Sequence, residues 1–481
     1  MLRIRPLLSL SLLLACLPAC RGGSVSVGVD AAPPADAAPP PSDGSPPPSD
    51  TALDAGSDAT DATPMDGTAN DADAGLPRGL HSLAGFSADL PTGDLAPLLA
   101  TVGDADVVAL GESIHTSGGY YRMKERIFRF LVETAGYRGF AIENPWPQAD
   151  QVSEYVRTCE GDPEDIVREG LFGVWASASL RDIAQYMCTW NQEHPDDPLV
   201  FFGFDVQQPW DDGPALRAFL QEHAGSDAET LIAGTESCDG AFAADAAEYF
   251  ASPIRRQVPT GAHEACIAGL DAIGAFLEAE RSRLVGDIGV NAYDMGVVHL
   301  VGLRSWQDAA FQGPNNPFGP NDFPAAFEAR DRGMAQVFQT LWRIRAAEAK
   351  TVLWAHNTHI ATDYSNVSGS FSGGKSMGTF LADDLGERFT AIGLFGYDVE
   401  VNWINVRMGS IPVPSRDDGE TLLNELGVPY LFVDLDFTGA EMPLFAPGAR
   451  VGLQREVMVP RDQFRAMIFL QHSPAMESLR W

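Results

Sequence analysis

Short apolar runs that end on polar residues recur along the chain and predict buried strands. Residues 106–110 form the first run, which is too short for a helix and passes through Gly111 into Glu112 and His115. Residues 139–142 repeat the pattern and end on Glu143. Further runs of this kind cover residues 199–205, 351–356, 389–394, 430–434 and 466–469. Parallel strands present ligand groups beyond their carboxyl ends, so several of these polar residues are expected to face one cleft.

Helical periodicity follows the first strand. Between residues 120 and 134 arginines and a lysine take most of the polar positions, Gly136 ends the pattern, and one face is apolar: Met123, Ile127, Phe130 and Leu131. Strand, loop, helix and strand from 106 to 143 therefore make one βαβ unit. The expected fold class is α/β, with a central, largely parallel sheet flanked by helices.

The stretch from 206 to 350 predicts a helical insert. Its periodicity is clearest at 267–284 and 327–347, and a loop rich in Gly, Asn and Pro covers 312–324. We expect this insert to lie over the cleft at the carboxyl ends of the strands. The folded part, residues 81–481, shows no internal repeat and is long enough for one large domain with this insert or for two domains.

Residues 1–20 have the composition of a bacterial export signal. Arg3 and Arg5 precede a leucine-rich core and a small-residue end, and the apolar stretch is too short to span a membrane. The last four residues resemble a lipoprotein processing box that would leave Cys20 as the lipidated first residue, with Cys16 as a poorer second choice. Membrane contact is expected only through a lipid on Cys20, and ordinary secretion without a lipid is the alternative.

Residues 21–80 predict a disordered tether. They consist mainly of Ala, Pro, Ser, Gly and Asp and include no aromatic residue, so they cannot bury enough apolar surface to offset the entropy lost on ordering. Their ten aspartates repel one another, which keeps the tether extended.

The charge of the chain narrows the choice of partner. The formal net charge is −34, of which −28 falls on residues 81–481. Phosphate binding needs basic surface, so no nucleic acid partner is expected. An acidic surface would attract a cationic small substrate, although such surfaces also serve solubility alone.

The cysteines fit an exported protein. Beyond Cys20, four cysteines remain after processing, an even number that predicts two disulfides in an oxidising compartment and allows three connectivities. Proximity in sequence favours Cys159 with Cys188 and Cys238 with Cys266. Free buried thiols are the alternative, because a large domain does not depend on disulfides for its stability.

The candidate chemistry lies at three strand ends. An imidazole near its ordinary pKa is well suited to take a proton from water, and a carboxylate on its other nitrogen fixes the tautomer. The groups available for this are Glu112, His115, Glu143, His356 and His359. The alternative is structural: a polar loop that satisfies backbone groups after the first strand, and core histidines after the strand at 351.

These residues also carry a resemblance. The run from Gly111 to His115, the basic helix ending at Leu131, the strand ending at Glu143 and the later residues Trp354, Ala355, His356, Asn357 and His359 together resemble the erythromycin esterase family of macrolide-lactone hydrolases. The resemblance runs from about residue 80 to the end and includes Gly203–Asp205, Arg330 with Asp331, and residues 466–469.

The resemblance implies a reaction. Water activated at His115 would hydrolyse an ester or lactone, with Glu112 and Glu143 orienting it and either His356 or His359 aiding proton transfer, and with no cofactor or metal. Lys124 matches a basic position of the family's site and could stabilise an oxyanion; otherwise it belongs to the solvated face of its helix. Residues 116–119 replace the residues common in the family after the loop histidine, which leaves the substrate open.

Other functions compete with this interpretation. The same histidines and glutamates could hold a metal for a metal-dependent hydrolase, although Glu112 and His115 are not the two-histidine helix of zinc proteases. A lipid-anchored protein could instead bind a small cationic ligand in the cleft without turnover. Residues 369–376 and 374–378 match the phosphate-loop and serine-elbow patterns, but neither follows a buried strand, so a helix start near Ser376 is expected there.

Overall fold

The computed structural model describes most of the chain beyond residue 72. The described residues are 73, 75–238, 258–313, 316, 319–365, 367, 373–403, 406–410, 418–436 and 458–480. The predicted export signal, all but the last residues of the predicted tether, and residues 369–372 of the phosphate-loop pattern lie outside them.

A central sheet organises the described residues. The strands run β1, β8, β9, β6, β2, β5, β3, β4 across the sheet, and β7 pairs with β6. Pairing is parallel from β9 through β6, β2, β5 and β3 to β4 and antiparallel at β1, β8 and β7, so the predicted α/β class with a largely parallel sheet is confirmed. The strands are β1 (Leu80–Ser82), β2 (Val107–Leu110), β3 (Gly139–Pro145), β4 (Val200–Asp205), β5 (Thr351–Trp354), β6 (Phe389–Trp403), β7 (Val406–Ser410), β8 (Tyr430–Asp434) and β9 (Ala466–Ser473).

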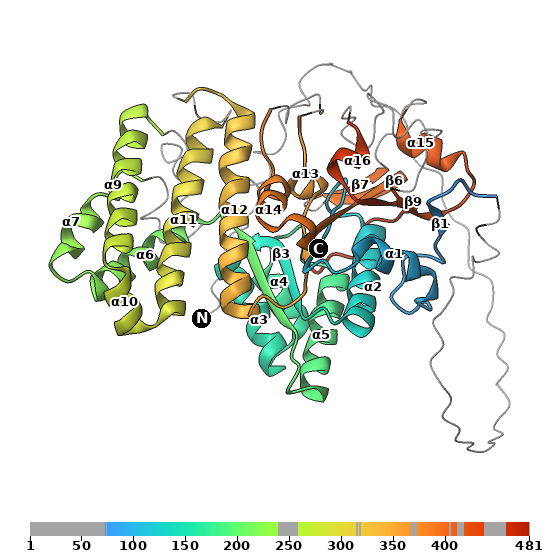
Figure 1. Ribbon diagram of the computed structural model, residues 1–481, viewed down its shortest axis with the longest axis horizontal. Coiled ribbons are helices and arrows are strands. Elements are labelled where there is room, and N and C mark those ends of the chain that lie inside the picture. The colour runs from blue at the N-terminus through green and yellow to red at the C-terminus, as the bar shows by residue number, and fades with distance from the viewer. Residues whose placement is uncertain are drawn as a thin grey trace, which may run out of the picture.

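Helices cover both faces of the sheet (Figure 1). In Figure 1, α2 to α5 lie below the sheet, and α12, α11 and then α9, α10 and α7 extend away from its β4 edge. The helices are α1 (Ala96–Val102), α2 (Gly118–Ala135), α3 (Trp146–Thr158), α4 (Pro163–Gly170), α5 (Ala178–Glu193), α6 (Pro209–His223), α7 (Ala228–Ala233), α9 (Thr260–Ala279), α10 (Arg281–Ile288), α11 (Val290–Gln312), α12 (Phe323–Ala346), α13 (Asn357–Ile360), α14 (Met377–Leu385), α15 (Gly419–Asn424) and α16 (Pro460–Gln463).

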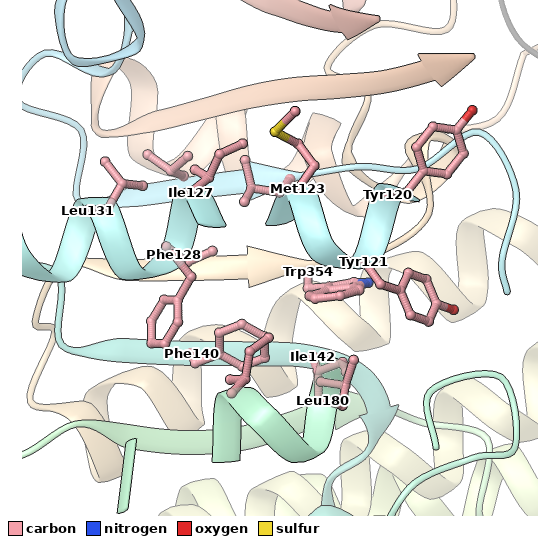
Figure 2. Packing of buried hydrophobic residues seen from close by; sticks show 14 of the residues in the cluster. Tyr120, Tyr121, Met123, Ile127, Phe128, Leu131, Phe140, Ile142, Leu180 and Trp354 are labelled. Carbon is pink, nitrogen blue, oxygen red and sulfur yellow. The ribbon is translucent and has the colours of Figure 1, made fainter. Parts of the chain in front are cut away.

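The main apolar core lies between α2 and the strands. Met123, Ile127 and Leu131 repeat at helical spacing and are completely buried, as are Phe140 of β3 and Trp354 of β5 (Figure 2). A left-handed Gly136, with φ 72°, ends α2 and turns the chain toward β3. This packing fixes where α2 begins, and therefore where the loop after His115 must run.

A separate apolar cluster lies in the predicted insert. It joins α6, α7, α9, α10 and α11 through residues such as Leu220, Leu270 and Leu284, whereas Val298 on the other face of α11 belongs to the cluster between α12 and the sheet. Helix α11 thus packs against a different apolar core on each of its two faces. The predicted disulfide Cys238–Cys266 lies in this outer cluster, and the predicted Cys159–Cys188 links the end of α3 to α5, so both pairings are confirmed.

Some boundaries differ from the sequence prediction. The single helix expected at 267–284 is divided at Glu280 into α9 and α10, and the short strands β1 and β7 were not predicted because each lacks a long apolar run. Asp73 accepts hydrogen bonds from Ser82 N and Oγ, both at 2.8 Å, so the folded part begins before residue 81. The helix start at Ser376 is confirmed, since its side chain caps α14.

Candidate active site

Strand register brings the predicted residues together at one edge of the sheet. Leu110 of β2 and Ile142 of β3 both pair in parallel with Trp354 of β5. Residues just beyond these positions therefore leave the sheet side by side, although they lie far apart in sequence. All six predicted site residues are placed here: Glu112, His115, Lys124, Glu143, His356 and His359.

The first group, which we call the His115 cluster, contains Glu112, His115 and Lys124. The Glu112 carboxylate is fully buried and is shared: Oε1 lies 2.7 Å from His115 Nδ1, and Oε2 accepts a hydrogen bond from Lys124 Nζ at 2.7 Å. Its negative charge is thus matched by the lysine, and its other oxygen orients the imidazole.

Lys124 turns inward from α2 and does not reach the solvent. Its ammonium lies 4.3 Å from the Trp354 ring centroid and 3.4 Å from the Ala355 carbonyl oxygen. Burial lowers the pKa of Lys124 to about 8, although Glu112 opposes this shift. The expectation that this cation faces a substrate oxyanion is not met, because its donors end on groups inside the protein.

His115 is the open end of this cluster. Its side chain keeps 19% of its surface exposed, whereas Glu112 and Lys124 keep none. The ring stands edge-on against Trp175 at 4.8 Å and against His356 at 5.0 Å between centroids. Because Nδ1 faces Glu112, Nε2 is the nitrogen left for other partners, and it contacts no hydrogen-bonding group in the described part of the chain.

The second group, the His359 cluster, is built around Arg330 of α12. The guanidinium donates to both oxygens of Asp205 at 3.1 and 3.0 Å and to Glu143 Oε1 at 2.9 Å. Burial would raise the pKa of Glu143, but His359 and Arg330 outweigh it and hold that pKa well below its usual range. Glu143 is therefore a fixed negative charge.

His359 has partners on both ring nitrogens. Nδ1 lies 2.8 and 2.9 Å from the two oxygens of Asp331, and Nε2 lies 3.0 Å from an Arg330 nitrogen and 3.3 Å from Glu143 Oε1. Burial opposes the charged ring, yet Asp331 and Glu143 raise the pKa of His359 above its ordinary value. The neutral ring accepts from Arg330, and the protonated ring donates to Glu143.

His356 is occupied as a helix cap. Because a carbonyl oxygen can only accept, Nε2 must donate to Ser113 O at 3.0 Å, and Nδ1 then accepts from the backbone of Thr358 at 3.2 Å. Burial, together with the charges of His115 and His359, lowers the pKa of His356 well below its ordinary value. This neutral ring holds the loop after β5 against the loop after β2 and has no nitrogen left for substrate.

A close backbone approach ties the same loops together. The Asn357 amide lies against Gly111, where an added Cβ would come 1.9 Å from Asn357 Oδ1. That amide donates to Leu394 O of β6 at 3.0 Å, so it links three strands at the site edge. Glycine is required at position 111 because any side chain would displace this link.

The sequence did not predict a site role for Arg330, Asp331 or Asp205. A signal was present, since an arginine and an aspartate occur side by side in the helical pattern at 327–347 and Asp205 ends a strand run. Asp331 is fully buried and also accepts from Met377 N at 2.8 Å, which anchors the start of α14.

Among the described residues, no group of three or more His, Cys, Asp or Glu side chains is arranged to hold a metal ion.

No helix in the described parts of the chain combines the length and apolar composition needed to cross a bilayer.

A comparison with protein-family models identifies the family of this chain. The family model described as erythromycin esterase matches residues 132–473, which is more than half of the chain. The chain belongs to the erythromycin esterase family. Glu143, Arg330, His356 and His359 fall inside the matched range, whereas Glu112 and His115 precede it.

Individual relatives extend this comparison. YbfO of Bacillus subtilis (strain 168), which carries the provisional name of a hydrolase, is 23% identical over 389 residues, covering 76% of this chain and 83% of that protein. Erythromycin esterase type II of Escherichia coli is 23% identical over 317 residues, covering 63% and 72%. A mutant of the erythromycin esterase EreC in its open conformation superposes with a TM-score of 0.65 at 18% identity, covering 83% and 98%. The family match and these two relatives support a hydrolase at the level of the family, and the likeness to the EreC structure shows the fold.

Proposed function

We propose that this protein hydrolyses an ester or lactone bond of a small molecule with water activated by His115. The observation that carries the proposal is the state of the His115 ring: Nδ1 is held by a buried carboxylate, and Nε2 is free within the described part of the chain. That is the arrangement a general base needs, because the proton can be taken only at the nitrogen that has no partner.

The reaction uses these residues in turn. His115 Nε2 takes a proton from water while the water oxygen attacks the carbonyl carbon, and Glu112 stabilises the imidazolium that forms. Of the two site cations, Arg330 keeps 12% of its side-chain surface exposed and Lys124 keeps none. Arg330 already donates to Asp205 and Glu143, and its exposed part is suited to stabilise the negative oxygen of the tetrahedral intermediate. Collapse breaks the ester bond, and the leaving alkoxide takes the proton from His115, giving an acid and an alcohol.

A substrate screen with a matched variant tests the proposal. Purified wild type is incubated with esters and lactones, including macrolides that carry an amino sugar, and products are followed by mass spectrometry. For any substrate turned over, His115→Asn should lower kcat by ~10²–10⁴-fold. His194→Ala, an exposed histidine at the end of α5, is the control and should match wild type.

Two outcomes would change the conclusion. Full activity in His115→Asn would remove the assignment of the base. Measurable binding of candidate ligands with no change in their mass would favour the non-catalytic binding protein.

We also propose that the protein is exported and anchored by a lipid on Cys20. The two disulfides support an oxidising compartment. Labelling with a fatty acid should be seen in the wild type and be absent in Cys20→Ala; equal labelling of both would contradict a lipid anchor at Cys20.

The acidic charge of the chain supports a cationic substrate. The kcat/KM for such a substrate should then fall with increasing salt concentration.

A further inference from the structure

We propose that residues 474–480 act as a positioning strap that fixes the ring of His115 by holding two loops at once. The inference rests on the proposed function, in which His115 is the base. The two loops are residues 116–118, directly after His115, and residues 171–178, which carry Trp175.

The first attachment holds the loop after His115. Met476 N donates to Thr116 O at 2.9 Å, and Gly118 N donates to Pro474 O at 2.6 Å. At the start of the strap, Ser473 at the end of β9 shares a buried hydroxyl contact with Ser117 at 2.6 Å. These contacts leave the loop little freedom to move away from the strap.

The second attachment holds the loop with Trp175. Ala178 N donates to Glu477 O at 2.9 Å, and Leu479 N donates to Ala176 O at 2.9 Å. The Arg480 guanidinium donates to Leu171 O at 2.5 Å. The strap therefore forms isolated antiparallel bridges to two segments outside the central sheet, Ala475 opposite Ser117 and Ser478 opposite Ser177.

Both attachments converge on the ring of His115. Trp175, fixed by the second attachment, is the aromatic neighbour of His115 at 4.8 Å and donates from Nε1 to Glu143 O at 2.5 Å. Thr116, fixed by the first attachment, is the next residue in the chain. The strap thus restricts the position of the His115 ring in two ways, through the backbone of the next residue and through the aromatic ring that packs against it.

The conformation of Thr116 shows that the loop needs such a restraint. Its φ is 68°, a left-handed value that a β-branched residue rarely adopts, and its buried Oγ1 has no hydrogen-bond partner in the described residues. A conformation of this kind persists only where the surroundings over-determine it. The Tyr121 hydroxyl, which accepts from Thr116 N at 3.0 Å, and Met476 N provide that support.

Glycines make the approach of the strap possible. An added Cβ on Gly118 would come 2.7 Å from Ala475 O, and one on Gly119 would come 2.3 Å from Ser473 Oγ. The start of α2 is therefore shaped to accept the strap.

The test compares three variants of the full chain with the wild type. One ends at Met476 and so loses the second attachment, Ser473→Ala loses the hydroxyl contact, and Glu477→Gln keeps every backbone contact and is the matched control. The readouts are kcat, KM and the proton NMR resonance of the His115 ring, which His115→Asn identifies among nine histidines.

The shortened chain should lose about 10²-fold in kcat, because a catalytic group displaced by about an ångström loses that much, while KM changes far less. Ser473→Ala should lose about fivefold, the loss of one hydrogen bond, and it keeps the test valid if the shortened chain does not fold. In both variants the His115 resonance should move, because the Trp175 ring current depends on their separation. Glu477→Gln should match the wild type in all three readouts.

Two results would contradict the proposal that residues 474–480 position His115. One is a kcat within twofold of wild type in both variants; the other is a fall in kcat with an unmoved His115 resonance, which would indicate a structural role alone. The resonance needs no turnover, so a wild type that hydrolyses nothing would refute the proposed function while still testing the strap.

Discussion

Two buried clusters of histidine, carboxylate and cation lie at the same edge of the sheet, and they differ in how completely the imidazole is used. His359 keeps 5% of its side-chain surface exposed and has partners on both nitrogens, whereas His115 keeps 19% and has a partner on one. A histidine with both nitrogens bonded holds a charge in place. One with a free nitrogen can move a proton.

The charges of the two clusters differ in the same way. In the His115 cluster one carboxylate faces one lysine, so no negative charge is left in excess beside the ring. In the His359 cluster three carboxylates, Glu143, Asp205 and Asp331, face Arg330 and His359. The excess of negative charge there favours a protonated ring, which is unsuited to act as a base.

Removing the cation of the His359 cluster should have the largest effect. Arg330→Met leaves the carboxylates of Glu143 and Asp205, 5% and 1% exposed, without their cation. Breaking a buried pair of this kind lowers the free energy of unfolding by about 3–5 kcal/mol, which urea denaturation would measure. Arg332→Met, two residues along α12 and 56% exposed, should change it by less than about 0.5 kcal/mol. Equal losses in the two variants would show that the His359 cluster does not depend on Arg330.

The His115 cluster should respond to pH through Lys124. As pH rises through about 8, the pKa of this lysine, Glu112 loses its cation and kcat should fall. Arginine stays charged in this range, so Lys124→Arg should move the alkaline limb upward by at least about one pH unit. Lys375→Arg, at an exposed lysine, is the control. If the alkaline fall in kcat came at the same pH in Lys124→Arg as in the wild type, Lys124 would not be the group that causes it.

Unfolding does not explain such a loss. The pKa of Lys124 in the folded chain, about 8, lies below its ordinary value of 10.5. Between these two values the unfolded chain binds the proton more tightly, so this group adds stability as pH rises. Between about pH 8 and 10.5, kcat should therefore decline while the contribution of Lys124 to the free energy of unfolding grows. Thermal unfolding measured across the same pH range would test this.

Chelation should have the smallest effect, with activity within about twofold of the untreated protein. Both oxygens of Glu112 face a histidine or lysine, and Glu143 faces Arg330, so a divalent ion would have to displace cations already in place. Activity lost to a chelator and restored by zinc or manganese would instead support a metal-dependent hydrolase.

The sequence predicted which residues meet at the candidate site because strand ends are a local feature. Apolar runs ending in Glu112, Glu143 and His356 could be recognised one at a time, and parallel pairing then placed them together. The two disulfides followed from proximity in sequence in the same way.

The sequence could not predict how each side chain is used. The contact between Arg330 and Glu143 joins residues 187 positions apart, and it depends on how α12 packs beside β4. Whether His356 caps a helix or faces a substrate is decided by a carbonyl oxygen on another loop, Ser113 O. Such pairings depend on three-dimensional packing, which the spacing of residues does not encode.

The position of α11 between two apolar cores affects how the chain unfolds. Its two faces belong to different apolar cores, and the outer core has a disulfide of its own, so the outer helices can lose their packing while the sheet retains its own. Calorimetry of the intact chain should then resolve more than one transition, and a single melting temperature would not describe its stability. A thermal shift measured on adding a ligand would first have to be assigned to one of those transitions.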